Sequence, residues 1–388
     1  MALGCCICFS SYLVSFYTTK LIIDTTGNDA DFSMTLKKYF GKKGYYTGII
    51  APALLMLGVL SVLFVLLSEL SYPVLLSIYF WCKPGDDQPK AQTEPVFNAF
   101  SSAYTAIALY FILVSISSKK NLGVFIRLGS LGAIFVTIFV IAIVGLGVYS
   151  GNMVEYKIGT TEENRETLWE NIHGVRTIVL FQANFSPLAS LLGTGYYLHT
   201  CAVPIMRNAK KPEHNTRNLF IGYTIVFICY IIIGGVGYMG FIGPLFSHYF
   251  HNIKYTAHSG LIEQNCLNMF GYTDVIAFIV RLAVFMLLFS TYPMLNLFMR
   301  THLLNLFFQN KEVTQKHLII LNLIVTLIPL SFAIWYPNIG TIISWTGAFA
   351  GFIIIYCLPV MVYLKKRYVQ ITNPLLAEAI SLNEFRVI

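Results

Sequence analysis

Two neighbouring hydroxyl side chains, Ser290 and Thr291, place oxygen atoms in the middle of a long apolar stretch. Pro293 follows closely, and because proline lacks a backbone N–H it frees a carbonyl of the preceding turn from its usual helical donor. Hydroxyl and carbonyl oxygens are the ligands that a hard cation such as sodium prefers. The alternative is that each hydroxyl bonds to a carbonyl of its own helix at a proline kink. The residues alone leave both interpretations open.

A second stretch combines residues that disturb a helix. Pro187 removes a backbone donor, and Gly193 and Gly195, on either side of Thr194, allow the backbone to unwind. Unwound backbone at membrane depth must line a cavity or be buried in protein, so the stretch is suited to holding a small polar ligand. The alternative is that Pro and Gly are merely common in membrane helices. His199 follows one turn later, where packing is expected rather than ligand contact.

The elements that carry these residues are membrane-spanning helices. Hydrophobic residues make up 56% of the 388 positions and charged residues only 11%, a composition too apolar for a soluble domain. The predicted fold is therefore all-α and polytopic. Apolar stretches long enough to cross a bilayer predict nine spans, at residues 1–23, 45–72, 97–118, 122–150, 177–205, 219–245, 274–299, 317–335 and 339–364.

Basic residues are distributed unevenly between the two sides of this predicted bundle. Of the 26 Lys and Arg residues, six fall in loops on one side, Arg281 lies within a span, and the remaining nineteen share the other side. Because cytosolic loops carry the excess of basic residues, we expect a transmembrane domain at residues 1–364 and a cytosolic tail at 365–388. The six are Lys83, Lys90, Lys157, Arg165, Arg176 and Lys254.

The remaining reactive or charged side chains suggest structural roles. Cys82 and Cys266 are the cysteines in loops on the non-cytosolic side, where a disulfide can persist, so we predict that they pair. We expect Glu69 to lie at the membrane surface and Arg281 to reach it by extending its side chain. The sequence contains no zinc-protease motif, nucleophile elbow or phosphate-binding glycine loop, so it predicts neither an enzyme nor a nucleic-acid-binding protein.

Four stretches resemble the sodium-coupled neutral amino acid transporter family, solute carrier family 38 in the amino acid/auxin permease branch, and especially its lysosomal, arginine-sensing members. The stretches occur in the order expected for that family, which makes the resemblance more specific than any single motif such as YPNIG. They are DTTGNDADFSMTLKKYFG at 24–41, RNAKKPEHNTRNLFIGY at 207–223, residues 261–295 around LFSTYPML, and residues 321–351 around WYPNIGTIISWTG.

The resemblance implies a leucine-transporter-like fold. Members have eleven helices, the first ten forming two inverted repeats, and residues 1–23 align with the second helix, so we expect the first and eleventh helices to be missing. In this fold an amino acid binds between two broken helices. The resemblance implies that Gly193, Thr194, Gly195 and Tyr196 contact that substrate. It also implies that Ser290 and Thr291 supply half of a sodium site.

The function implied is secondary active transport of amino acids, arginine and larger neutral ones, by sodium-linked alternating access. The implied location is the lysosomal or late endosomal membrane, so the partners are the substrate and the lipid bilayer. Two alternatives remain open, a non-transporting amino acid sensor in nutrient signalling and an inactive truncated product. Members that report to a nutrient-signalling complex do so through an N-terminal cytosolic tail, which these residues do not include.

Overall fold

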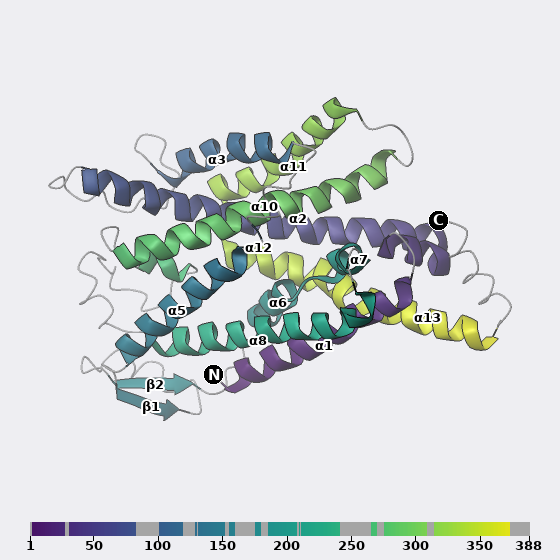
Figure 1. Ribbon diagram of the computed structural model, residues 1–388, viewed down its shortest axis with the longest axis horizontal. Coiled ribbons are helices and arrows are strands. Elements are labelled where there is room, and N and C mark those ends of the chain that lie inside the picture. The colour runs from purple at the N-terminus through teal and green to yellow at the C-terminus, as the bar shows by residue number, and fades with distance from the viewer. Residues whose placement is uncertain are drawn as a thin grey trace.

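The computed structural model of the chain describes a bundle of helices that run along its long axis (Figure 1). Among the described residues, six helices are long and apolar enough to cross a membrane. The described residues are 2–27, 31–82, 101–118, 129, 131–151, 155–159, 175–179, 185–207, 209, 211–240, 265–269, 275–308 and 314–372.

The helices follow one another in the order that the apolar stretches predict. The first part of the chain forms α1 (Ala2–Thr26), α2 (Phe32–Cys82), α3 (Ser102–Ser117) and α5 (Gly132–Gly151). The middle part forms α6 (Ser186–Gly195), α7 (His199–Arg207), η2 (Pro212–His214) and α8 (Asn215–Gly240). The last part forms η3 (Cys266–Met269), α10 (Val275–Phe308), α11 (Gln315–Trp335), α12 (Ile339–Thr346), the π-helix η4 (Gly347–Cys357) and α13 (Leu358–Thr372).

Among the described residues, every predicted span overlaps at least one of these helices, so the helical membrane class is confirmed. The ends differ from the prediction at several places. α2 extends beyond residue 72 to Cys82, and α13 continues through Thr372 into the predicted tail. Residues 373–388 of that tail lie outside the described residues.

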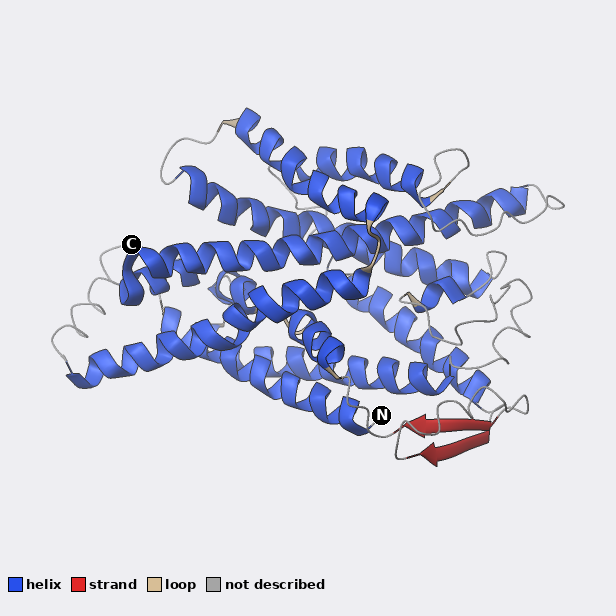
Figure 2. Ribbon diagram, turned by 180° about the vertical axis from the view of Figure 1, so that it is seen from behind, coloured by secondary structure: helices blue, strands red, loops and turns tan. Residues whose placement is uncertain are grey.

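A two-stranded sheet was not predicted. β1 (Glu155–Gly159) pairs in parallel with β2 (Val175–Val179), with Glu155 opposite Val175 (Figure 2). The predicted span at 177–205 therefore begins as a strand, and its helix begins only at Ser186. Pro187 sits in the first turn of α6, where its missing N–H leaves no helical bond unmade. This proline starts a helix rather than breaking one.

Two helix boundaries have clear local causes. α2 consists of two helices joined at Gly41, whose φ of 66° is a left-handed conformation that favours glycine. α11 ends at Trp335, and Asn338 caps α12 by accepting a hydrogen bond from the backbone N–H of Thr341 at 3.0 Å. The YPNIG stretch thus separates two helices as predicted.

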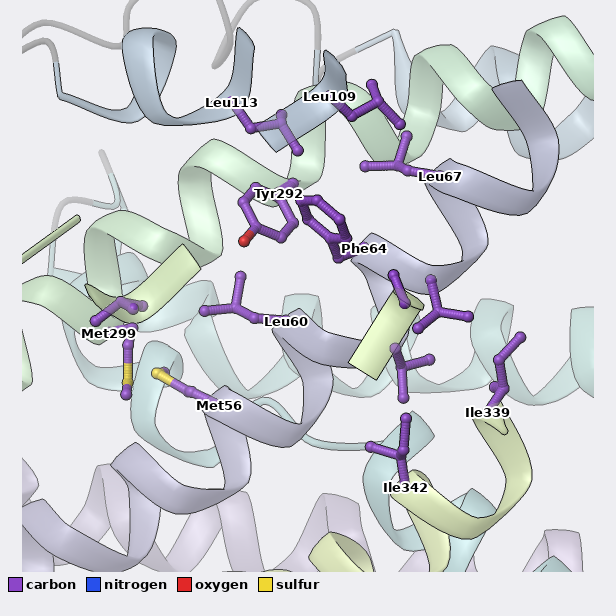
Figure 3. Packing of buried hydrophobic residues seen from close by; sticks show 14 of the residues in the cluster. Met56, Leu60, Phe64, Leu67, Leu109, Leu113, Tyr292, Met299, Ile339 and Ile342 are labelled. Carbon is purple, nitrogen blue, oxygen red and sulfur yellow. The ribbon is translucent and has the colours of Figure 1, made fainter. Parts of the chain in front are cut away.

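The central core lies between α2 and α10, with α3, α11 and α12 around it. Met56, Leu60 and Phe64 repeat every four residues along one face of α2, and Figure 3 shows them pointing toward α10 and its neighbours. The rings of Phe64 and Tyr292 meet edge to face with centroids 5.9 Å apart. This packing joins α2 and α10 in one hydrophobic core.

A glycine, Gly347, allows η4 and α6 to approach each other closely. A Cβ atom added to Gly347 would lie 2.6 Å from Thr194 Oγ1 and 2.7 Å from the backbone oxygen of Ser190. Small residues at helix contacts let two backbones approach closely in a membrane. Gly347 therefore allows η4 to lie directly against α6.

We predict that Gly347→Ala lowers the free energy of unfolding by about 1–3 kcal/mol, because the added methyl group meets backbone that cannot move aside. Thermal unfolding of the purified protein in detergent measures this change. Gly222→Ala on α8 is the control, since a Cβ there meets open space. Equal stability of the two variants would contradict the close contact.

Candidate functional site

The helix that carries Gly193 to Tyr196 is broken just after Gly195. α6 ends there, residues 196–198 are not helical, and α7 begins at His199. The last backbone bonds of α6 join the Tyr196 N–H to the Leu192 oxygen at 2.9 Å and the Tyr197 N–H to the Thr194 oxygen at 3.2 Å. The predicted unwinding is therefore present, and it lies immediately C-terminal to the two glycines.

Two tyrosines of α8 hydrogen-bond the carbonyl groups that the break frees. The Tyr230 hydroxyl donates to the Gly195 oxygen at 3.1 Å, and the Tyr223 hydroxyl donates to the Tyr196 oxygen at 3.0 Å. The tyrosines are seven residues apart, about two helical turns, and so share one face of α8. Backbone oxygens without helical partners thus obtain donors from a neighbouring helix.

The side chain of Tyr196 is buried among the same residues. Its hydroxyl lies 3.4 Å from Cys8 Sγ of α1. Its ring lies against those of Tyr223 and Tyr230, with centroids 6.0 and 5.2 Å away. Tyr223 also lies 2.7 Å from Thr19 Oγ1 of α1. α1 and α8 therefore hold the break together through hydroxyl groups.

His199, the first residue of α7, is fully buried and bonded to α1. Its Nε2 lies 2.8 Å from Thr18 Oγ1. The Thr18 hydroxyl donates its own hydrogen to the Val14 backbone oxygen at 2.9 Å. Nε2 then carries the hydrogen, and Nδ1 has no hydrogen-bond partner among the described residues. The geometry shows the expected packing role and leaves one acceptor atom of the ring open beside the break.

A cavity of about 820 Å³ lies beside the break. Its walls come mainly from α1, α6 and α8 and are mostly aliphatic, with few polar groups, the composition typical of small-molecule sites. Thr194 and Gly195 line the cavity, as does Tyr230. Gly193 and Tyr196 do not line it, because Gly193 faces Tyr356 of η4 and Tyr196 is buried against Cys8. The cavity thus brings together two of the four predicted substrate residues.

The predicted sodium ligands lie on another set of helices. Ser290 and Thr291 are on α10, which packs on α2, α5 and α3, whereas α6 packs on η4, α12 and α1. Both hydroxyls donate to the Leu287 oxygen, at 2.8 and 2.7 Å. The intrahelical alternative is therefore formed. Each hydroxyl oxygen still has lone pairs for a cation, so the sodium site stays a prediction.

Three further predicted features have structural outcomes. Cys82 and Cys266 are both free thiols, so their disulfide is not formed here and remains a prediction. Arg281 was predicted to extend to the membrane surface, but it is fully buried, and its guanidinium donates to the Leu267 backbone oxygen of η3 at 2.8 Å. Glu69 lies within α2 and is partly buried.

Comparison with known proteins shows the family of the chain. Residues 1–373 match the sequence pattern of the family described as transmembrane amino acid transporter protein. The chain belongs to this transporter family. The match covers almost the whole chain, including α6, α7 and the cavity, and it confirms the resemblance inferred from the sequence.

Curated relatives of the chain are longer proteins. It is 25% identical to the sodium-coupled neutral amino acid transporter 9 homolog of Caenorhabditis elegans, over 94% of this chain and 64% of the relative. It is 24% identical to neutral amino acid transporter 9 of Danio rerio, over 90% of this chain and 66% of the relative. A shorter match to the Rattus norvegicus protein is 30% identical over 48% of this chain. The chain thus spans less than two thirds of the length of these relatives.

The residues that hold the break were not predicted from the sequence. Tyr223 and Tyr230 read as ordinary aromatic residues of an apolar span, and Thr18 and Thr19 as small polar residues of another. The seven-residue spacing of the two tyrosines is the one signal that could have indicated a shared face. Only the positions of the freed carbonyls in the folded chain show what that face contacts.

We predict that replacing Tyr223 and Tyr230 together by Phe destabilises the break, because each lost hydroxyl leaves a carbonyl without its donor at about 1–3 kcal/mol. Amide hydrogen exchange at residues 196–200 should become faster, and the thermal midpoint in detergent should fall. Tyr238→Phe is the control, since Tyr238 lines the same cavity without a hydrogen bond to the described residues. Equal effects of the double variant and the control would reject this role.

Proposed function

We propose that this chain carries an amino acid across a membrane by alternating access, with the substrate bound at the break between α6 and α7. The observation that carries the proposal is that the break opens onto an apolar cavity in a chain that belongs to an amino acid transporter family. That family is one of transporters rather than enzymes. The activity of the longer relatives is assigned to this chain only as part of the proposal.

The two half-helix ends suit the two charges of an amino acid. The C-terminal end of α6 presents the carbonyl oxygens of Gly195 and Tyr196, and each oxygen has a second lone pair beside the one that a tyrosine uses. The N-terminal end of α7 presents backbone N–H groups and a partial positive charge. An ammonium group fits the first end and a carboxylate the second, while the aliphatic cavity receives the side chain.

The proposed substrates are arginine and the larger neutral amino acids. A cavity of about 820 Å³ has room for a long side chain, and the names of the relatives state neutral amino acids. The name of the worm relative also states sodium coupling, which supports sodium as the driving ion, with Ser290 and Thr291 as ligands. Substrate entry and release would alternate as the helices around the break rock against the α2–α10 core.

We also propose a lysosomal or late endosomal location with the C-terminus in the cytosol. In Figure 1 the C-terminal ends of α1, α10 and α13 and the N-terminal ends of α2 and α8 gather at one end of the bundle. These ends carry Lys20, Lys37, Arg217, Arg300 and Lys366, all predicted to be cytosolic. The common placement supports the orientation, since basic residues are retained on the cytosolic side.

Purified protein in liposomes should show saturable uptake of labelled arginine, glutamine or leucine. We expect Gly195→Ala to raise KM on the order of tenfold, the factor for a loss of about 1.4 kcal/mol in binding. The reason is that the new Cβ would lie 2.8 Å from the Tyr230 hydroxyl oxygen and displace it from the break. Gly145→Ala on α5, where a Cβ meets open space, should leave KM unchanged. Absence of saturable uptake would reject the proposed transport.

A sodium gradient should stimulate this uptake, and the double variant Ser290→Ala and Thr291→Ala should lose the stimulation while keeping its fold. Both hydroxyls bond within their own helix, so their removal leaves helix contacts in place. Thr301→Ala is the matched control, because Thr301 makes the same kind of bond to Leu297 on the same helix. Full sodium stimulation in the double variant would remove the sodium assignment.

A further inference from the structure

A second cavity, of about 390 Å³, lies between the C-terminal half of α1 and α13, which contact each other. On α1 its lining includes Tyr17, Lys20 and Asp24, and on α13 it includes Tyr363, Arg367 and Gln370. In each helix these positions are spaced by three or four residues and so form one face. The two polar faces meet across the cavity, unlike the aliphatic walls of the first cavity.

Three cations line this space. Lys20 joins Lys366 and Arg367, while Asp24 is the one carboxylate that the described residues contribute to the lining. The formal charges of these lining residues sum to +2. A cavity with this charge favours an anion, and its volume falls in the range of small-ligand sites, about 300–1,000 Å³.

Two of the cations are held in place with donors to spare. Lys366 Nζ donates to the backbone oxygens of Asp24, at 3.2 Å, and Thr25, at 3.4 Å, near the C-terminal end of α1. An ammonium group has three donors, so one remains. The guanidinium of Arg367 lies 5.6 Å from the Tyr363 ring centroid, and its Nε donates to the Tyr363 hydroxyl at 3.4 Å. Its two terminal nitrogens remain for bidentate contact with a phosphate.

The cavity lies near the ends of two apolar candidate spans, where lipid headgroups are expected. α1 and the helix that ends as α13 are apolar candidate spans, and the cavity is formed where both become basic and tyrosine-bearing. Tyrosine and long basic side chains concentrate at the membrane–water interface. Basic pockets between membrane helices at this level bind phosphate-bearing lipid headgroups.

We propose that this cavity binds the phosphomonoester headgroup of an anionic membrane lipid, with Lys20, Lys366 and Arg367 contacting the phosphate. A phosphomonoester carries about −1.5 to −2 charges at neutral pH, which matches the cavity better than a singly charged headgroup. The occupied cavity would fix α13 against α1. This site lies apart from the proposed substrate cavity, and its test does not depend on transport.

Binding can be measured by thermal stabilisation of the full chain in detergent with short-chain lipids. We expect dioctanoyl phosphatidylinositol monophosphate to stabilise the protein at micromolar concentration, and dioctanoyl phosphatidylserine or phosphatidylcholine to require at least tenfold more. Equal potency of phosphatidylserine, or equal stabilisation by inorganic phosphate or free inositol phosphate, would overturn the lipid assignment.

Variants locate the binding in the cavity. Lys20→Gln with Arg367→Gln should weaken the phosphoinositide at least tenfold, while Gln370→Lys should strengthen it by adding a fourth cation to the lining. Lys365→Gln is the matched control, because the Lys365 ammonium lies over the Tyr368 ring, 5.2 Å from its centroid, and is not in the lining. If the double variant fails to fold, Gln370→Lys decides alone. Unchanged affinity in Gln370→Lys, or equal losses in the double variant and the control, would overturn the proposal.

Discussion

A helix that breaks inside a membrane must find protein donors for the carbonyl groups that it frees, because lipid supplies none. The donors in this chain are the hydroxyls of Tyr223 and Tyr230 on α8, which hold the oxygens of Tyr196 and Gly195. α1 completes the arrangement through Thr19 and through the bond between Thr18 and His199. The positions of α1 and α8 beside the break follow from this requirement.

Glycines allow close helix contacts on the other side of α6 and between α2 and α12. Gly347 of η4 packs against Thr194 and Ser190, and Gly58 of α2 packs against Thr346 of α12. Close backbone approach of this kind contributes much of the contact energy between helices in a membrane. η4 is a π-helix, a form that often occurs at functional sites. The break is thus held by polar bonds on one side and by close packing on the other, with the apolar cavity beside them.

α1 links two cavities of opposite chemistry. Its N-terminal residues Leu3 to Cys8 line the apolar cavity at the break, whereas Tyr17 to Thr25 line the basic cavity against α13. The same helix also bonds to the first residue of α7. A movement of α1 would therefore change both cavities together, which gives the proposed lipid site a physical route to the proposed substrate site.

The sequence by itself determined the helical membrane fold, most helix positions and the place of the break. An apolar stretch of sufficient length must be helical in a bilayer whatever lies beside it, and Gly193 and Gly195 weaken the helix locally. Only the tertiary structure decided which side chains serve the break. Tyr223, Tyr230 and Thr18 act on partners 27, 35 and 181 residues away in the chain. The burial of Arg281 and the state of the Cys82 and Cys266 thiols likewise depend on neighbours that no local pattern specifies, because a hydrogen bond or a disulfide is set by the approach of two separate segments in space.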